Sequence, residues 1–131
     1  MPGVPAVFAI PGDLQTVTGG YIYERRLLES LRAQGRDVVH LQLPASYPDP
    51  SAAEMEAAAA ALAAVDPGRV LILDGFVSGV TQGLERVRAP MVAVVHHPLA
   101  LETGLDPARR DHLFRTEKAS LALMAHILVP S

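Results

Sequence analysis

A chain of 131 residues with a net charge of −3 and 19% charged residues has the size and composition of one folded domain. The absence of cysteine excludes disulfides, thiolate metal sites and thiol nucleophiles. The acidic balance, without any block rich in lysine or arginine, argues against a nucleic-acid partner. No basic and apolar leader opens the chain, and no apolar run approaches the ~20 residues that span a bilayer, so we expect a cytoplasmic protein with peripheral membrane contact at most.

The first half of the chain alternates apolar runs with helical patterns. The run at 6–10 predicts a strand buried on both faces. Leucines at helical spacing predict a helix over 20–35, and the run at 37–43 predicts a second strand. Ser51 and Glu54 have the spacing of a capping box, which predicts the start of a second helix.

The second half continues the alternation. The run at 70–74 predicts a third, buried strand. A short helix is expected over 78–87. Ser78 is expected to cap this helix and not to act as a hydrolase nucleophile, because the glycines around it lack the spacing of a nucleophile turn. The run at 91–95 predicts the fourth strand.

The last helix has a clear start signal. Asp106 followed by Pro107 predicts an N-cap and a first helical residue. A mostly apolar stripe is then expected along the helix, made of Phe114, Glu117, Leu121 and Met124. The run at 126–129 predicts a fifth strand.

Strands that alternate with helices predict an α/β fold: a Rossmann-like open parallel sheet with helices on both faces and right-handed crossovers. In such sheets the first and fourth strands typically lie side by side where the strand order reverses, so we expect this of the strands at 6–10 and 91–95. Ligands bind in the crevice at that point. No helix follows the fifth strand, so the chain reads as a domain incomplete at its C-terminal end. An uncovered sheet edge of this kind favours self-association.

A diglycine turn is the first candidate binding site. Gly19 and Gly20 follow Thr18 at a predicted helix start, where free amides and the helix dipole attract phosphate or carboxylate. The alternative is a flexible helix cap without a ligand, since neither standard phosphate-binding signature is present.

Two adjacent histidines follow the fourth predicted strand. His96 or His97 could hydrogen-bond a sugar hydroxyl or stabilise charge that develops on a phosphate. Neighbouring strand residues point to opposite faces, so one histidine is expected to face the cleft while the other packs beneath it. A purely structural role is the alternative for both.

Two carboxylates complete the candidates. Asp74 ends the third predicted strand and could contact a ligand or shape a turn. Glu102 follows the histidines and could orient one of them or bind a substrate hydroxyl, unless it is simply a solvated loop residue. No metal site is expected, because the remaining histidines fall on separate elements.

Four segments in this order resemble the amino-terminal domain of GT-B glycosyltransferases, in particular the large retaining group called family four. The matching segments are Thr18–Glu24, Leu73–Phe76, His96–Gly104 and the tail, which runs from Thr116–Leu121 through Ile127–Ser131. No single motif is diagnostic, and the resemblance rests on their order along nearly the whole chain. It implies that residues 1–131 form part of the amino-terminal domain and that a carboxyl-terminal nucleotide-sugar domain is absent from this chain.

The resemblance also implies the chemistry. Gly19 and Gly20 would approach the phosphates of a nucleotide-sugar donor, and His96, or His97 as second choice, would contact the donor sugar. The acceptor, a sugar or a lipid-linked molecule, would bind this domain, and transfer would need no metal or other cofactor. The chain alone is expected to be inactive. Two alternatives are a non-enzymatic module that binds a small sugar or phosphate ligand, and a GT-B sugar-nucleotide epimerase.

Overall fold

The computed structural model describes residues 5–12, 22–96, 98–101 and 103–130. The strands are β1 (Ala6–Pro11), β2 (Val38–Leu43), β3 (Val70–Asp74), β4 (Met91–Val94) and β5 (His126–Leu128). The helices are α1 (Ile22–Ala33), α2 (Ala52–Ala63), α3 (Gly75–Val80) and α4 (Pro107–Leu121), with short 3-10 helices η2 (Leu84–Arg86) and η3 (Leu99–Leu101).

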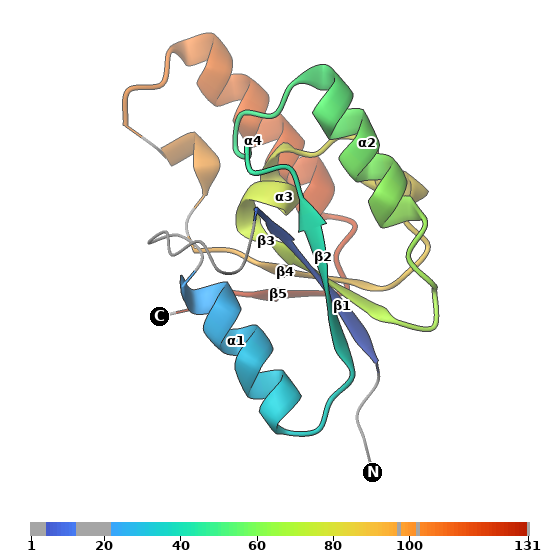
Figure 1. Ribbon diagram of the computed structural model, residues 1–131. Helices are drawn as coiled ribbons and strands as arrows, with labels where there is room; N and C mark the ends of the chain where they lie inside the picture. The colour runs from blue at the N-terminus through green and yellow to red at the C-terminus, as the bar shows by residue number, and fades with distance from the viewer. Residues whose placement is uncertain (1–4, 13–21, 97, 102, 131) are drawn as a thin grey trace.

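The five strands form one parallel sheet in the order β2-β1-β3-β4-β5 (Figure 1). Ala6 of β1 pairs with Val38 on one side and with Val70 on the other, so β1 is an interior strand. The predicted α/β class and parallel sheet are confirmed. Each strand points its carboxyl end to the same edge of the sheet.

The prediction that the first and fourth strands lie side by side is wrong, because β3 lies between β1 and β4. The chain leaves β1 toward β2, then returns over β1 through α2 and adds β3 to the free side of β1. The strand order therefore reverses between β1 and β3. In open parallel sheets, ligands typically bind beyond the carboxyl ends of the two strands at such a reversal.

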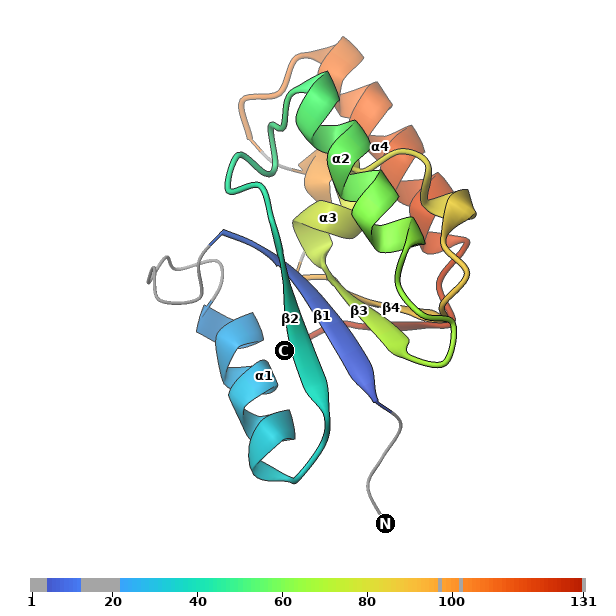
Figure 2. The same ribbon diagram turned by 45° about the vertical axis from the view of Figure 1, so that its right-hand side comes forward.

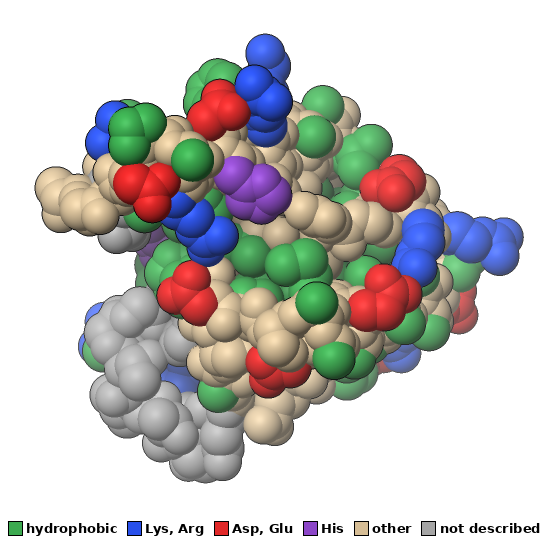
Figure 3. All heavy atoms as spheres, turned by 90° about the horizontal axis from the view of Figure 1, so that it is seen from above, with side chains coloured by type: hydrophobic (Ala, Val, Ile, Leu, Met, Phe, Trp, Pro, Cys, Tyr) green, Lys and Arg blue, Asp and Glu red, His purple; other side chains and the backbone are tan. Residues whose placement is uncertain are grey.

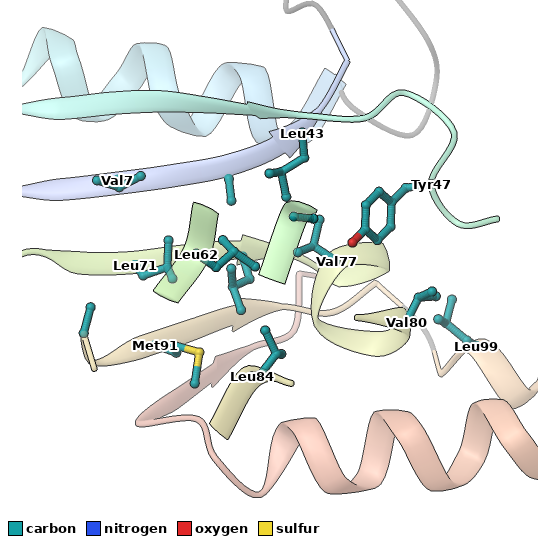
Figure 4. Close-up of a cluster of buried hydrophobic side chains, with 14 of the residues drawn as sticks. Val7, Leu43, Tyr47, Leu62, Leu71, Val77, Val80, Leu84, Met91 and Leu99 are labelled. Atoms are coloured by element: carbon teal, nitrogen blue, oxygen red, sulfur yellow. The ribbon is translucent and has the colours of Figure 1, made fainter. Parts of the chain in front are cut away.

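The helices cover both faces, as predicted (Figures 1 and 2). Helix α1 lies on one face, where Leu28 packs with Phe8 and Ile10 of β1. Helices α2, α3 and α4 lie on the other face. Their core (Figure 4) includes Val7, Leu43, Tyr47, Leu62, Leu71, Val77, Val80, Leu84, Met91 and Leu99. Alternate residues of β1 thus enter opposite cores, which explains why the whole strand is buried.

The helix expected over 78–87 is wrong in its start and its extent. Helix α3 begins at Gly75, and the Asp74 side chain caps it by accepting a hydrogen bond from the Phe76 amide at 2.9 Å. Ser78, expected as the cap, lies inside the helix and donates to the Gly75 carbonyl at 3.3 Å. Gly83, with φ of 85°, separates η2 from α3.

The other helix caps are confirmed. Ser51 and Glu54 make both hydrogen bonds of the capping box, and Asp106 accepts from the Arg109 amide at 2.7 Å. The stripe expected along α4 is partly wrong, because Phe114 is 55% exposed. The buried residues of α4 are Leu113, Glu117 and Ser120.

The sheet ends at an exposed edge strand. All three residues of β5 are exposed, and the large apolar side chains exposed in and around it are Leu123, Ile127, Leu128 and Val129. Among the described residues, no helix combines the length and the apolar character needed to cross a bilayer.

Candidate functional site at the carboxyl edge of the sheet

Three titratable side chains from distant parts of the sequence lie together beyond the carboxyl ends of the strands. Glu24 comes from the first turn of α1, Asp74 from the end of β3, and His96 from the loop after β4. The His96 Nε2 atom lies 2.8 Å from the Glu24 Oε1 atom. Asp74 lies close enough to both for its pKa to respond to them: Glu24 raises it and His96 lowers it. We call these three residues the acid–histidine cluster.

Glu24 is fully buried although it is a carboxyl group. It precedes Leu28 by one helical turn, so the face of α1 that packs on the sheet also carries Glu24 toward the cluster. A carboxylate in the first turn is favoured by the helix dipole. Its Oε2 atom has no N–H or hydroxyl partner within the described part of the chain. A buried polar atom left in this way points to a functional arrangement.

Asp74 is held by the structure that follows it. Its Oδ2 atom caps α3, and only 3% of the residue is exposed. Gly75 lets α3 start directly beside β4, because a Cβ atom there would lie 2.7 Å from the Val94 carbonyl oxygen. The cap and the glycine together fix the Asp74 carboxyl at the sheet edge.

The two acids share one desolvated site, which changes their titration. Burial, and secondarily the neighbouring Glu24, raise the pKa of Asp74 to about 8, against the opposing effects of the Phe76 amide and His96. Burial also raises the pKa of Glu24, whereas its hydrogen bond with Asp74 lowers it. Two carboxyls in one buried site cannot both ionise readily. At neutral pH the pair therefore keeps a proton.

His96 is the member of the cluster that ligands can reach. Its side chain is 38% exposed, while Glu24 holds one ring nitrogen. The Tyr23 ring packs edge-on against the imidazole, with 5.4 Å between ring centroids. Tyr23 and Glu24 thus place the first turn of α1 against the loop after β4, across the end of β3.

The structure brings together two of the residues predicted from the sequence, Asp74 and His96. The other predicted site residues lie outside the described residues: Thr18, Gly19, Gly20, His97 and Glu102. Glu24 was not predicted as a site residue. The sequence feature that could have identified Glu24 is its spacing: it lies four residues before Leu28 and seven before Leu31. This spacing places a carboxylate on the apolar stripe of the helix.

A second buried acid supports the loop after His96. Glu117 of α4 accepts a hydrogen bond from the Leu99 amide at 3.2 Å through its Oε1 atom. This contact ties η3 to α4. Within the described ranges, no group of three or more histidine, aspartate or glutamate side chains could hold a metal ion.

A groove opens between the loop after β2 and helix α4. Figure 3 shows this end of the molecule, where hydrophobic side chains lie among charged ones and a histidine. The hollow has a volume of about 270 Å³, and its lining includes Phe76, Leu99 and Leu113. Asp49 and Arg109 form an ion pair of 3.1 Å at its rim. We call this hollow the α4 groove.

No protein-family model, no curated protein and no solved structure matches this chain.

Proposed function

We propose that this chain is the acceptor-side part of a retaining glycosyltransferase, which moves a sugar from a nucleotide-sugar donor to an acceptor hydroxyl. The observation that carries the proposal is the half-exposed His96 ring at the carboxyl edge of a parallel sheet, held by Glu24 and Tyr23 of α1. Ligands of open α/β sheets bind at this edge. In the proposal His96 contacts the donor sugar.

The surroundings of His96 suit a polyhydroxylated ligand. The edge of the His96 imidazole can form hydrogen bonds with hydroxyl groups. Because buried carboxyl groups lie beside it, the cluster has no net positive charge that would attract an anion. Gly19 and Gly20 precede α1 in the sequence, and the first turn of α1 contacts His96. The proposal therefore assigns the donor phosphates to that glycine segment and the donor sugar to His96.

The acceptor is assigned to the α4 groove. Its apolar lining would bury the apolar part of an acceptor molecule, and its charged rim would bind the polar part. Small-molecule sites commonly combine an apolar lining with a few polar groups in this way. Phe76 links the two sites, because its amide is held by Asp74 of the acid–histidine cluster and its side chain lines the groove.

The proposal includes no metal or other cofactor and no transfer by this chain alone. The resemblance places most of the donor site in a second domain, so the 131-residue chain would bind a donor weakly and would not turn it over. The proposal includes a cytoplasmic location. Detectable sugar transfer by the 131-residue chain alone would contradict the proposal that its donor site is incomplete.

The test is a titration of the chain with UDP-glucose and GDP-mannose, followed by NMR. We expect at least one to bind, and His96→Ala to weaken that binding about fivefold, because one hydrogen bond of about 1 kcal/mol is lost. His126→Ala is the matched control, since His126 is exposed at the start of β5. Binding that is unchanged in His96→Ala, or absent for both donors, would contradict the proposal.

A further inference from the structure

We infer that His96 presents its Nδ1 atom to the ligand as a hydrogen-bond acceptor, because Glu24 holds the proton-bearing Nε2 atom. The ligand group that meets His96 is then a hydroxyl and not a phosphate oxygen. The assignment of the ring nitrogens depends only on the cluster. The naming of the ligand group as a sugar hydroxyl rests on the proposed function.

The first step is the contact between Glu24 and His96. The 2.8 Å separation of Oε1 and Nε2 is that of a charge-assisted hydrogen bond. An ionised carboxylate can only accept, so Nε2 must donate. A neutral imidazole has one donor nitrogen and one acceptor nitrogen. Nδ1 is therefore the acceptor when Glu24 is ionised.

The second step is the location of the proton shared by the two acids. The Asp74 Oδ2 atom already accepts from the Phe76 amide, which leaves Oδ1 to carry a proton. Burial, and secondarily the neighbouring Glu24, raise the pKa of Asp74 to about 8, so Asp74 keeps its proton at neutral pH. A proton on Asp74 also supplies the donor that the buried Glu24 Oε2 atom lacks among the described residues. Glu24 is therefore the ionised member of the pair.

The third step is what the free nitrogen can bind. No described residue bonds Nδ1, and the ring is partly exposed. A sugar hydroxyl can donate to this nitrogen. An ionised phosphate oxygen cannot, and it would also approach the negative charge on Glu24. Glu24 is thus a positioning residue that selects for hydroxyls through His96.

The test is NMR of the whole 131-residue chain with ¹⁵N-labelled histidine at about pH 7.5, a pH at which histidine is usually neutral. The His96 signals are assigned by their loss in His96→Asn. We expect the tautomer with the proton on Nε2 in the free protein. A proton on Nδ1, or on both nitrogens, would overturn the inference.

Three variants test the cause of the tautomer. Glu24→Gln should lose the single tautomer, because an amide can donate to Nε2 as well as accept from it. Glu29→Gln, on an exposed acid of the same helix, should keep it. Asp74→Asn should also keep it, because the amide group replaces the protonated carboxyl as a donor to Glu24. A tautomer unaltered in Glu24→Gln, or lost in Asp74→Asn, would overturn the inference.

The ligand class is tested with two probes on the same signals. Glucose should shift the Nδ1 resonance and leave the tautomer unchanged, while inorganic phosphate should leave both unaffected. A larger response to phosphate than to glucose would overturn the hydroxyl assignment. If the Nε2–H tautomer is found and no nucleotide sugar binds, the proposed function fails and the tautomer assignment stands. If a nucleotide sugar binds while Nδ1 carries the proton, the inference alone fails.

Discussion

Asp74 shows at the scale of one residue how a buried functional group affects stability. Burial and Glu24 raise its pKa to about 8 from an ordinary value of 3.8. The folded protein therefore holds a proton that the unfolded chain releases at much lower pH. Between these two pKa values the folded state binds more protons than the unfolded state, so stability must fall as pH rises.

The first prediction concerns this pH dependence. From about pH 5 to about pH 8 the free energy of unfolding should decrease, with Asp74 contributing up to about 1.4 kcal/mol per pH unit. Asp74→Asn should make the decrease shallower, since an amide does not titrate and still caps α3. The measurement is urea unfolding at several pH values. Asp111→Asn, on an exposed acid of α4, is the control, and parallel curves for wild type and Asp74→Asn would contradict the account.

The sequence predicted two members of the cluster for a clear physical reason. Asp74 and His96 directly follow buried apolar runs, and the carboxyl ends of parallel strands gather at one edge. Glu24 was missed because an acid in the first turn of a helix is ordinary there. Only its place on the apolar stripe, in line with Leu28, distinguishes it. That it reaches His96 depends on how α1 packs across β3, which the sequence pattern does not specify.

At the scale of elements, Gly75 and Asp74 determine how α3 begins. The helix starts without a connecting loop, so its first residue passes close to β4. The helix predicted from the sequence starts later, at Ser78, whereas α3 begins at Gly75 and includes Gly79, two residues of low helix propensity. Close packing overrides that propensity: a Cβ atom at Gly79 would lie 2.5 Å from a Leu99 methyl carbon. Tertiary contacts of this kind are invisible to local patterns, whereas the capping signals of α2 and α4 are local and were read correctly.

The second prediction is that Gly75→Ala destabilises the protein by about 1–3 kcal/mol, the range for forced overpacking. The added Cβ atom would press on the Val94 carbonyl, two residues before His96, so binding of a nucleotide sugar should weaken as well. Urea unfolding measures the first effect and NMR titration the second.

The control for Gly75→Ala is Gly68→Ala. At that turn a Cβ atom would meet only the Asp66 side chain, at 3.2 Å, and a side chain can move more easily than a backbone carbonyl. Equal losses of stability at the two glycines would contradict the argument that β4 requires Gly75.

At the scale of the whole molecule, the fold class was predictable and the strand order was not. Alternating strands and helices imply a parallel sheet, but periodicity does not say to which edge β3 adds. It adds beside β1, so β1 and β4 are separated. The cluster still forms because Glu24 and Tyr23 reach His96 across the end of β3.

The third prediction concerns the edge of the sheet at β5. An exposed edge strand with unpaired backbone groups and apolar neighbours favours pairing with a second copy. We expect a concentration-dependent dimer in sedimentation velocity. Ile127→Lys together with Val129→Lys should shift the protein toward monomer, because charges on an edge strand oppose pairing. A wild-type monomer at high concentration, or an unchanged dimer in the double variant, would contradict this.

The central claim is that a nucleotide sugar binds beyond the carboxyl ends of β1, β3 and β4, with its sugar at His96. Its most direct test is a map of backbone amide chemical shifts on addition of the nucleotide sugar that binds. The account predicts that the largest changes fall at Tyr23, Glu24, Gly75 and His96. Changes concentrated instead at the opposite edge of the sheet, around Val38, Val70 and His126, would contradict it.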